Sequence, residues 1–191
     1  MNKQIVISGL GGQGVLFITR LLAEALMDEK EHVLTSETHG MAQRGGIVIS
    51  HLKVGDFNSP LIRPGHADLV VALKDETLDQ HYSFLKKGGK AIVNSLSDSL
   101  KDFSGDSSMN FLKEISASPE NNIKNINADF LAQKDNNQGS VNLYMLGAAL
   151  AFEPVCSIEK VKEQIEKRLA KKDKKIRLAA VTALEHGFVS V

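Results

Sequence analysis

The sequence has few of the residues that build covalent or metal-stabilised proteins. Its 191 residues include one cysteine, Cys156, and no tryptophan. A single cysteine cannot form an internal disulfide, and it cannot supply the several thiolates that an iron–sulfur cluster or a structural zinc site needs. We expect Cys156 to be a buried or half-buried small residue. The histidines show no spacing typical of metal ligands, so no metal site is predicted.

Long apolar runs and a surplus of one charge are also missing. No apolar stretch approaches the roughly 20 residues of a membrane span, and the first residues become glycine-rich before the core of a signal peptide could form. The 23 basic and 23 acidic side chains balance, which argues against a nucleic-acid binder. We therefore expect a cytoplasmic protein with no membrane and no nucleic-acid partner.

The composition is that of an ordinary soluble globular protein, with 42% hydrophobic and 24% charged residues. At this length one domain with a real core is the default. Neither an internal repeat nor a linker divides the chain. We predict a single domain over residues 1–191.

The first half of the sequence alternates between strand and helix patterns. Ile5–Ile7 is a short β-branched run, glycines follow it, and helical spacing extends from about Gly14 to Asp28. His32–Ser36 is the next expected strand, so the chain opens like a doubly wound α/β sheet. Ile47–Val54 and Leu69–Leu73 are strands with no helix between them. The pattern predicts a Rossmann-like, mostly parallel sheet with an antiparallel insertion.

The middle of the sequence continues the alternation. Asp75–Lys86 has a helical pattern that Gly88 and Gly89 are expected to end, and Ala91–Val93 is a further buried strand. The serine-rich stretch Ser95–Asn110 is expected to be a loop or a mobile segment. A weak strand over Ile123–Asn127 and a short helix from Ala128 follow.

The last part of the sequence is predicted to be helical. The segment Leu143–Phe152 is apolar on every side, which is typical of a helix buried in the fold or against a partner. Ser140 is the expected cap of this helix, and Ser157 the expected cap of the next one. A final helix should run from about Lys174 to His186 and stop at Gly187.

The strongest motif lies between the first strand and the first helix. It consists of Gly9, Leu10, Gly11, Gly12, Gln13 and Gly14. Its spacing fits the dinucleotide-binding fingerprint, in which bare N–H groups at a helix N-terminus favour an anion. Glu37 lies near the place of a ribose-binding acid. The alternative is that the glycines only make a tight turn.

A second motif follows the second strand, where doubly wound sheets bind ligands. It consists of Ser36, Glu37, Thr38, His39, Gly40, Met41, Ala42, Gln43, Arg44, Gly45 and Gly46. Such a loop can bind a phosphate, a carboxylate or a partner surface, and Arg44 is the strongest candidate because its charge is permanent. An ordinary solvated histidine at His39 and a salt bridge from Arg44 to Glu37 are the alternatives.

Together the two motifs resemble the small subunit of 2-oxoacid:ferredoxin oxidoreductases, the gamma subunit of the pyruvate and 2-oxoglutarate enzymes or the beta subunit of indolepyruvate oxidoreductase. The segments 9–14 and 36–46 carry the resemblance. The strand at 66–73, the apolar helix at 141–149 and the closing helix at 179–187 extend it over nearly the whole chain. The motifs are specific for the family and not for the substrate.

The resemblance implies a role within a complex that decarboxylates a 2-oxoacid on thiamine diphosphate, reduces ferredoxin and releases an acyl-CoA. Because this chain lacks cysteines and a credible thiamine motif, thiamine diphosphate, Mg²⁺ and the iron–sulfur clusters are expected on a larger partner subunit. No catalytic residue is assigned here. The Gly9–Gly14 turn and the His39–Gly46 loop, including Gln43, Arg44 and Gly45, are expected to shape the partner's cleft and to hold an anionic group of the co-substrate CoA. A separate chain of this length is expected for the indolepyruvate type.

Two other classes of function remain open. A small NAD(P)-dependent oxidoreductase could use the same glycine fingerprint, although 191 residues leave little room for a substrate-binding segment. A non-enzymatic binding or scaffold protein is the third class. The basic stretch 160–177 is expected to be a solvated helix face, with a docking surface for an acidic partner as the alternative.

Overall fold

The computed structural model describes residues 1–39, 45–95 and 122–191, and its strands form one six-stranded sheet in the order β2-β3-β1-β4-β5-β6. Strands β1, β4, β5 and β6 are parallel, whereas β3 runs antiparallel to both β1 and β2. This arrangement confirms the predicted antiparallel insertion. The strands are β1 (Lys3–Leu10), β2 (Val33–His39), β3 (Ile47–Val54), β4 (Ala67–Ala72), β5 (Leu85–Asn94) and β6 (Asn122–Ile126).

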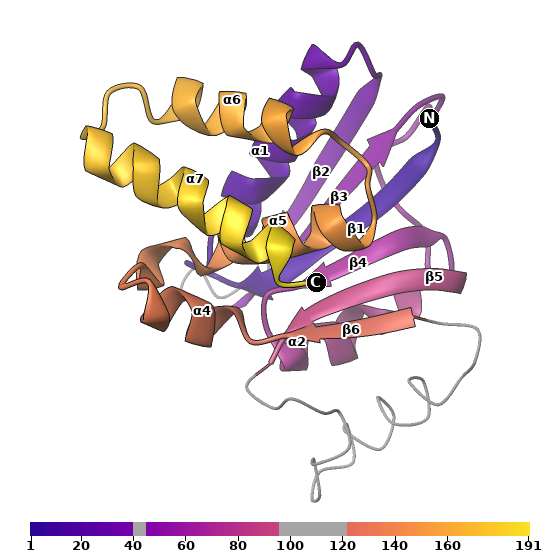
Figure 1. The fold of residues 1–191 in the computed structure, drawn as a ribbon. Helices are drawn as coiled ribbons and strands as arrows, with labels where there is room; N and C mark the ends of the chain where they lie inside the picture. The colour runs from indigo at the N-terminus through magenta and orange to yellow at the C-terminus, as the bar shows by residue number, and fades with distance from the viewer. Residues whose placement is uncertain (40–44, 96–121) are drawn as a thin grey trace, which may run out of the picture.

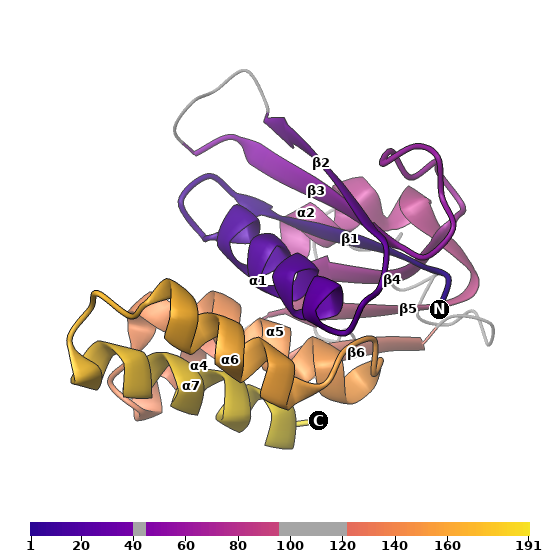
Figure 2. The ribbon, with the colours of Figure 1, turned by 90° about the horizontal axis from the view of Figure 1, so that it is seen from above.

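The helices lie mainly on one face of the sheet. Helices α1, α5, α6, α7 and α4 cover this face, and α2 packs on the other (Figure 2). None of the helices among the described residues is long and apolar enough to cross a membrane. The helices are α1 (Val15–Asp28), α2 (Asp75–His81), α4 (Ala128–Lys134), α5 (Val141–Phe152), α6 (Ile158–Arg168) and α7 (Lys174–Val189), with single 3₁₀ turns at Tyr82–Phe84 and Gln138–Ser140.

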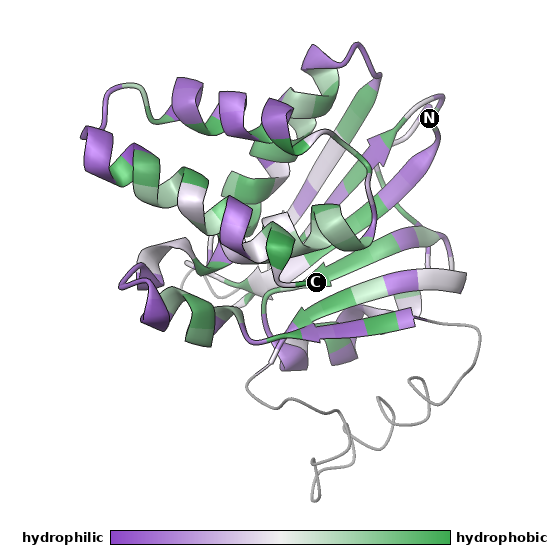
Figure 3. Ribbon diagram, viewed as in Figure 1, coloured by the Kyte–Doolittle hydropathy of each residue, from purple (hydrophilic) through white to green (hydrophobic). Residues whose placement is uncertain are grey.

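Alternation along β1 assigns its side chains to two separate cores. Ile5 and Ile7 belong to the core beneath α1 and α5, while Val6 belongs to the core beneath α2. Figure 3 shows β4 mostly hydrophobic, β6 mixed and much of α6 hydrophilic. Burial on both faces explains why these strands read as continuous apolar runs in the sequence.

Helix α5 is the buried helix that the sequence predicts, with Tyr144 and Met145 fully buried. It packs closely on α7, because Gly147 and Gly187 bring the two backbones together. A Cβ atom at Gly187 would lie 2.0 Å from the carbonyl oxygen of Tyr144. The prediction that the last helix stops at Gly187 is therefore wrong: the helix continues to Val189, and Gly187 serves this close approach.

The predicted helix over Asp75–Lys86 is too long. Helix α2 ends at His81, a single 3₁₀ turn follows, and β5 already begins at Leu85. Leu85 is buried in the core beneath α2 and pairs with Ala67 of β4. The next pair is Leu69 with Lys90, so the intervening glycines form an irregularity within the strand and do not terminate a helix.

Strand β2 is longer than its sequence suggests. It continues through the polar residues Glu37, Thr38 and His39 because these pair with β3. Ser140 and Ser157 stand at the expected N-cap positions, but neither side chain makes a capping hydrogen bond. The predicted serine-rich loop lies, apart from Ser95, outside the described residues.

Candidate functional site

The first motif forms a tight turn between β1 and α1. Gly9 lies in β1, just before its last residue, and Gly14 is the N-cap of α1. The Gln13 side chain closes the turn, since its Oε1 accepts from the Leu10 N–H at 2.6 Å, while the Gln13 N–H donates to the Leu10 carbonyl at 3.0 Å. Gln13 thus shapes the turn from within.

Gly14 is required at its position for two reasons. Its φ of +81° lies in the left-handed region. A Cβ atom there would also lie 2.2 Å from Nδ2 of Asn142, the side chain that α5 places against the turn. The Asn142 Nδ2 donates to the Gly14 carbonyl at 3.4 Å. The turn is therefore held between α1 and α5.

The structure brings the two sequence motifs together. The Gly11 N–H donates to the Gly46 carbonyl at 2.8 Å. His39 is the last residue of β2, and Gly45 and Gly46 precede β3, so the second motif is the connection of an antiparallel hairpin. Gln43 and Arg44 lie outside the described residues. Both motifs stand at the carboxyl end of β1, and the first one adjoins the boundary between β1 and β4, where the sheet reverses its strand order.

The position of Glu37 counts against dinucleotide binding. In the dinucleotide fold the strand that carries the ribose-binding acid lies beside the first strand. Here β3 lies between them, because Glu37 pairs with Ser50 and Ser50 pairs with Ile7. Two strand spacings, about 9.5 Å, separate Glu37 from β1. Its carboxylate instead lies 3.7 Å from Nε of Arg20 on α1.

Two hollows open on either side of the glycine turn. The larger hollow, about 590 Å³, lies between the turn, the start of α5 and the start of α7. The smaller hollow, about 300 Å³, lies between the turn, Leu73 and Asp129. Gly12, Gln13, Gly139 and Asn142 line both. The larger hollow is the more apolar, with Phe17, Leu143, Leu169 and Ile176 in its wall.

Three helices begin around the larger hollow. Gly14 at the start of α1, Ser140 at the start of α5 and Lys175 at the start of α7 all line it. The first N–H groups of a helix have no partner within the helix, and the helix dipole is positive there. The start of α7 is capped by Asp173, whose carboxylate accepts from the Lys175 N–H at 2.7 Å. The starts of α1 and α5, which no side chain caps, and the Lys175 ammonium group give the hollow an electrostatic preference for an anion.

The wall formed by residues 137–140, and Asp135 just before it, are held in place by hydrogen bonds. Asp135 accepts from the Tyr144 hydroxyl and from His186, each at 2.6 Å, and these hydrogen bonds lower the pKa of its carboxyl. Asn137 donates to the Ala179 carbonyl at 2.8 Å. The turn before α5 is thereby fixed to both α5 and α7.

Sequence reasoning missed the residues of this wall. Asn137, Gly139, Asn142 and Lys175 are far from the glycine motif in sequence and meet it only through folding. The polar run just before an apolar helix was the one available signal. The described residues contain no group of three metal-ligating side chains.

Cys156 and two histidines lie away from the hollows. Cys156 is half-buried, and burial together with nearby Glu29 raises the pKa of its thiol to about 12. His51 stands edge-on to the Phe84 ring with the ring centroids 5.4 Å apart, in the core beneath α2, and the His81 ring is tilted by 36° to the same ring with the centroids 6.2 Å apart. Burial lowers the pKa of both histidines. These groups contribute to structure rather than to the hollows.

Comparison with known proteins identifies the class. A model of the pyruvate ferredoxin/flavodoxin oxidoreductase family matches residues 4–189, so the chain belongs to this family. Indolepyruvate oxidoreductase subunit IorB of Archaeoglobus fulgidus is 43% identical over 95 residues, about half of each chain (50% of this one and 47% of that one). The IorB protein of Methanothermobacter thermautotrophicus is 33% identical over 159 residues, which is 79% of each chain.

Solved structures share the fold. Pyruvate oxidoreductase subunit PORC of Thermotoga maritima has a TM-score of 0.77 at 22% identity, over 98% of this chain and 96% of that one. A 2-oxoglutarate:ferredoxin oxidoreductase of Magnetococcus marinus, solved with 2-oxoglutarate, coenzyme A and succinyl-CoA bound, has a TM-score of 0.79 at 18% identity. There the likeness covers all of this chain and 31% of that longer chain.

Proposed function

We propose that residues 1–191 act as one gamma-type domain, the small subunit of a 2-oxoacid:ferredoxin oxidoreductase complex. The complex would convert a 2-oxoacid and CoA into acyl-CoA and CO₂, with the electrons passing to ferredoxin. The family match over residues 4–189 is the observation that carries the proposal. The substrate we propose is indolepyruvate or another aryl-pyruvate, which the two IorB relatives support.

The larger partner subunit would hold the redox groups. This chain does not fit an iron–sulfur cluster, because Cys156 is its one cysteine and the pKa of that thiol is raised. We assign thiamine diphosphate, Mg²⁺ and the clusters to the partner, and the isolated chain is expected to be inactive.

The part of this chain would be to complete the partner's cleft with the carboxyl edge of its sheet. The Gly9–Gly14 turn and the His39–Gly46 loop would form the lip of the cleft, joined by the bond from Gly11 to Gly46. An anionic group of CoA would lie in the larger hollow, where the uncapped starts of α1 and α5 meet Lys175. The apolar wall of the hollow suits the uncharged part of such a molecule.

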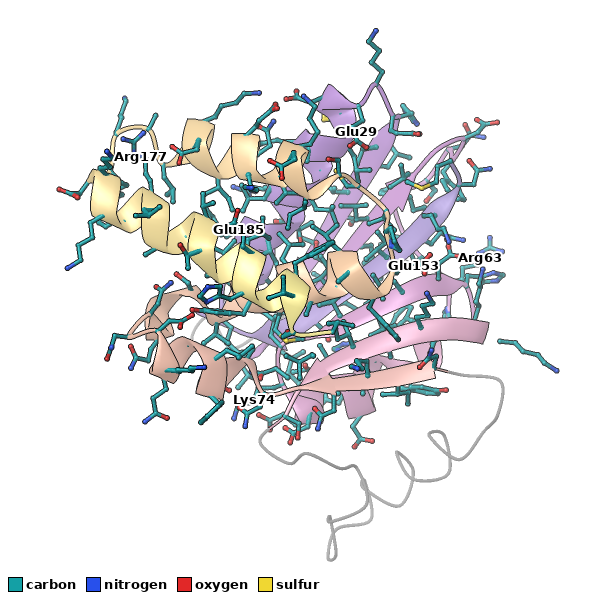
Figure 4. The ribbon with its side chains drawn as sticks, viewed as in Figure 1. Glu29, Arg63, Lys74, Glu153, Arg177 and Glu185 are labelled. Carbon is teal, nitrogen blue, oxygen red and sulfur yellow. The ribbon has the colours of Figure 1, made fainter. Side chains whose placement is uncertain are left out.

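The test is to express the chain with its larger partner and to assay aryl-pyruvate oxidation by the complex. Arg44→Ala in the complex should lower kcat/KM by about tenfold, since an arginine–anion contact contributes roughly 1–3 kcal/mol. Arg63→Ala is the matched control, because Arg63 is exposed at the opposite edge of the sheet (Figure 4). The kcat/KM of the complex that carries Arg63→Ala should not change.

Four results would contradict the proposal. Full 2-oxoacid oxidation by the isolated chain would remove the need for a partner. An unchanged rate in the Arg44→Ala complex would exclude the loop from the cleft. Micromolar binding of NAD or NADP to the isolated chain would instead favour the small dehydrogenase, and a stable monomer without partner or effect on any oxidoreductase would favour a scaffold.

A further inference from the structure

The basic stretch 160–177 divides into two parts with different surroundings. On α6 and at Arg177 of α7 the cations are paired: Lys167 lies 2.7 Å from Asp28, and Lys162 lies 2.7 Å from Glu185. Further pairs join Lys160 to Glu163, Arg168 to Glu24 and Arg177 to Glu166. The cations of this first part are thus neutralised within the chain.

The second part consists of the turn between α6 and α7 and the first two residues of α7. We call its four lysines, Lys171, Lys172, Lys174 and Lys175, the lysine turn. All four are exposed, and none pairs with a carboxylate of the described residues. Asp173 lies in the middle of the turn, where its carboxylate accepts from the Lys175 N–H at 2.7 Å and offsets one of the four charges. The remaining positive charges repel one another, and an acidic surface placed against them relieves that repulsion.

The lysine turn projects from the molecule. The hairpin of α6 and α7 extends beyond the carboxyl ends of the strands in both ribbon views (Figures 1 and 2). An exposed apolar side chain stands beside it: Leu178 is 62% exposed. Along α7, Ala180, Ala183, Leu184 and Gly187 are buried. Helical spacing puts Leu178 on the opposite side, one turn after Lys174.

A small anion in the larger hollow does not account for this surface. Lys175 lines the hollow, but Lys171, Lys172, Lys174 and Leu178 do not. These four side chains point to solvent outside it, and their combination of positive charge with an apolar centre is that of a protein interface. A fold of this kind also forms 31% of the longer Magnetococcus chain, where it is covalently part of a larger protein.

From these observations we infer that the lysine turn and Leu178 dock onto an acidic surface with an apolar depression on the larger subunit. This inference rests on the proposed function, because it takes the larger subunit as the partner. Docking there would set the mouth of the larger hollow against the partner, since Lys175 belongs both to the turn and to the hollow wall.

The test measures the dissociation constant of this chain and its purified larger partner at several salt concentrations. The docking variant carries Lys171→Gln, Lys172→Gln and Lys174→Gln. The control variant carries Lys160→Gln, Lys162→Gln and Lys167→Gln, which removes the same charge from paired lysines of α6. The docking variant should bind about tenfold more weakly at low salt and depend less on salt, and the control should stay within about twofold.

A second pair of variants tests the apolar centre. Leu178→Ala should weaken binding about fivefold, whereas Leu61→Ala should not, although Leu61, in the connection between β3 and β4, is also exposed, at 54%. Equal affinities for the docking and control variants would overturn the inference. So would an unchanged affinity accompanied by weaker CoA binding to the complex, which would assign the lysines to the ligand. Failure of the unmodified chain to bind the partner would instead contradict the proposed function.

Discussion

Different kinds of contact hold the amino and the carboxyl end of the sheet to α5. At the amino end, Glu153 is only 14% exposed in its side chain and accepts from Lys3 at 2.6 Å and Lys90 at 2.8 Å. Lys90 also donates to the Phe152 carbonyl and lies over the Phe152 ring. These contacts attach the end of α5 to β1 and β5. Figure 4 shows Glu153 at this end.

At the carboxyl end, glycines, side-chain amides and hollows replace the paired charges. Gln13 and Asn142 hold the glycine turn with single hydrogen bonds to the backbone. Helix α5 connects the two ends, since Asn142 lies in its first turn and Glu153 directly follows its last residue. One end of α5 therefore anchors the helix to the sheet, and the other end lines the hollows that could hold a ligand. Substitutions at the two ends should therefore alter different properties.

The largest effect is expected where α5 and α7 cross, because both ends depend on that crossing. Gly187→Val would push side-chain atoms into the backbone of α5, where even a Cβ lies 2.0 Å from the Tyr144 carbonyl. The free energy of unfolding should fall by about 3 kcal/mol, measured by urea denaturation. Gly139→Ala is the control, since its Cβ meets no atom within 4 Å. An equal loss in both variants would show that the crossing is not special.

Glu153→Ala should lower stability by less. It removes the shared partner of Lys3 and Lys90, and we expect a loss of about 1–2 kcal/mol because both lysines keep some solvent contact. CoA affinity and turnover of the complex should not change. Glu159→Ala, in a pair that is 69% exposed on the glutamate side, should be nearly neutral. A fall in turnover at unchanged stability would break the division between the two ends.

The pH dependence of stability should show two separate windows. Burial, the positive His81 and the positive Lys53 lower the pKa of His51 from its usual 6.5, so the fold favours the neutral ring. Stability is then complete above about pH 6.5 and is lost as the pH falls toward the lowered pKa. Burial alone would raise the pKa of Glu153, but Lys3 and Lys90 outweigh it and lower the pKa from 4.5. Its contribution is lost only below that value.

Thermal unfolding at stepped pH checks these windows. His51→Gln should make the first decline smaller, with the rest due to His81, whose pKa burial also lowers, and the exposed His66→Gln should leave it unchanged. Glu153→Ala should flatten only the second decline, in more acidic solution. A first decline of unchanged size in the His51→Gln protein would assign it to other groups.

The smallest effect on stability is expected at the carboxyl end. Gln13→Ala removes the acceptor of the Leu10 N–H and should cost less than about 1 kcal/mol. Turnover of the complex should nevertheless fall several-fold, because the turn loses its internal support. Gln133→Ala, at an exposed position on α4, is the control for both measurements. A larger loss of stability than for Glu153→Ala would reverse the comparison.

Much of the fold follows from local sequence patterns. The glycine turn after Ile5–Ile7 predicts the β1–α1 unit, and the missing helix after Val54 predicts the antiparallel strand. The errors occur where a distant contact overrides the local signal. Gly187 looks like a helix end, yet its contact with Tyr144 keeps it inside α7. Leu85 looks helical, yet pairing with Ala67 makes it part of a strand.

The candidate site was only half accessible to sequence reasoning. The two glycine-containing motifs are contiguous in sequence and carry recognisable spacing, and their hydrogen bond from Gly11 to Gly46 joins them. The opposite wall comes from residues such as Asn142 and Lys175, which meet the turn only after α5 and α7 have packed. No local pattern encodes that meeting. The roles of His39, Gln43 and Arg44 stay predictions.

The order in which the elements appear along the chain has a consequence for biosynthesis. Strands β1 to β5 are complete by Asn94, and α1 is made early enough to cover β1 and β3, but α5, which packs on β4 and β5 on the same face, and α7, which packs on α5, begin only at Val141 and Lys174. Val71 of β4 and Ile92 of β5 therefore leave the ribosome long before these helices exist. Until those helices emerge, we expect the nascent chain to need protection from aggregation, and premature termination before Val141 to yield an insoluble product.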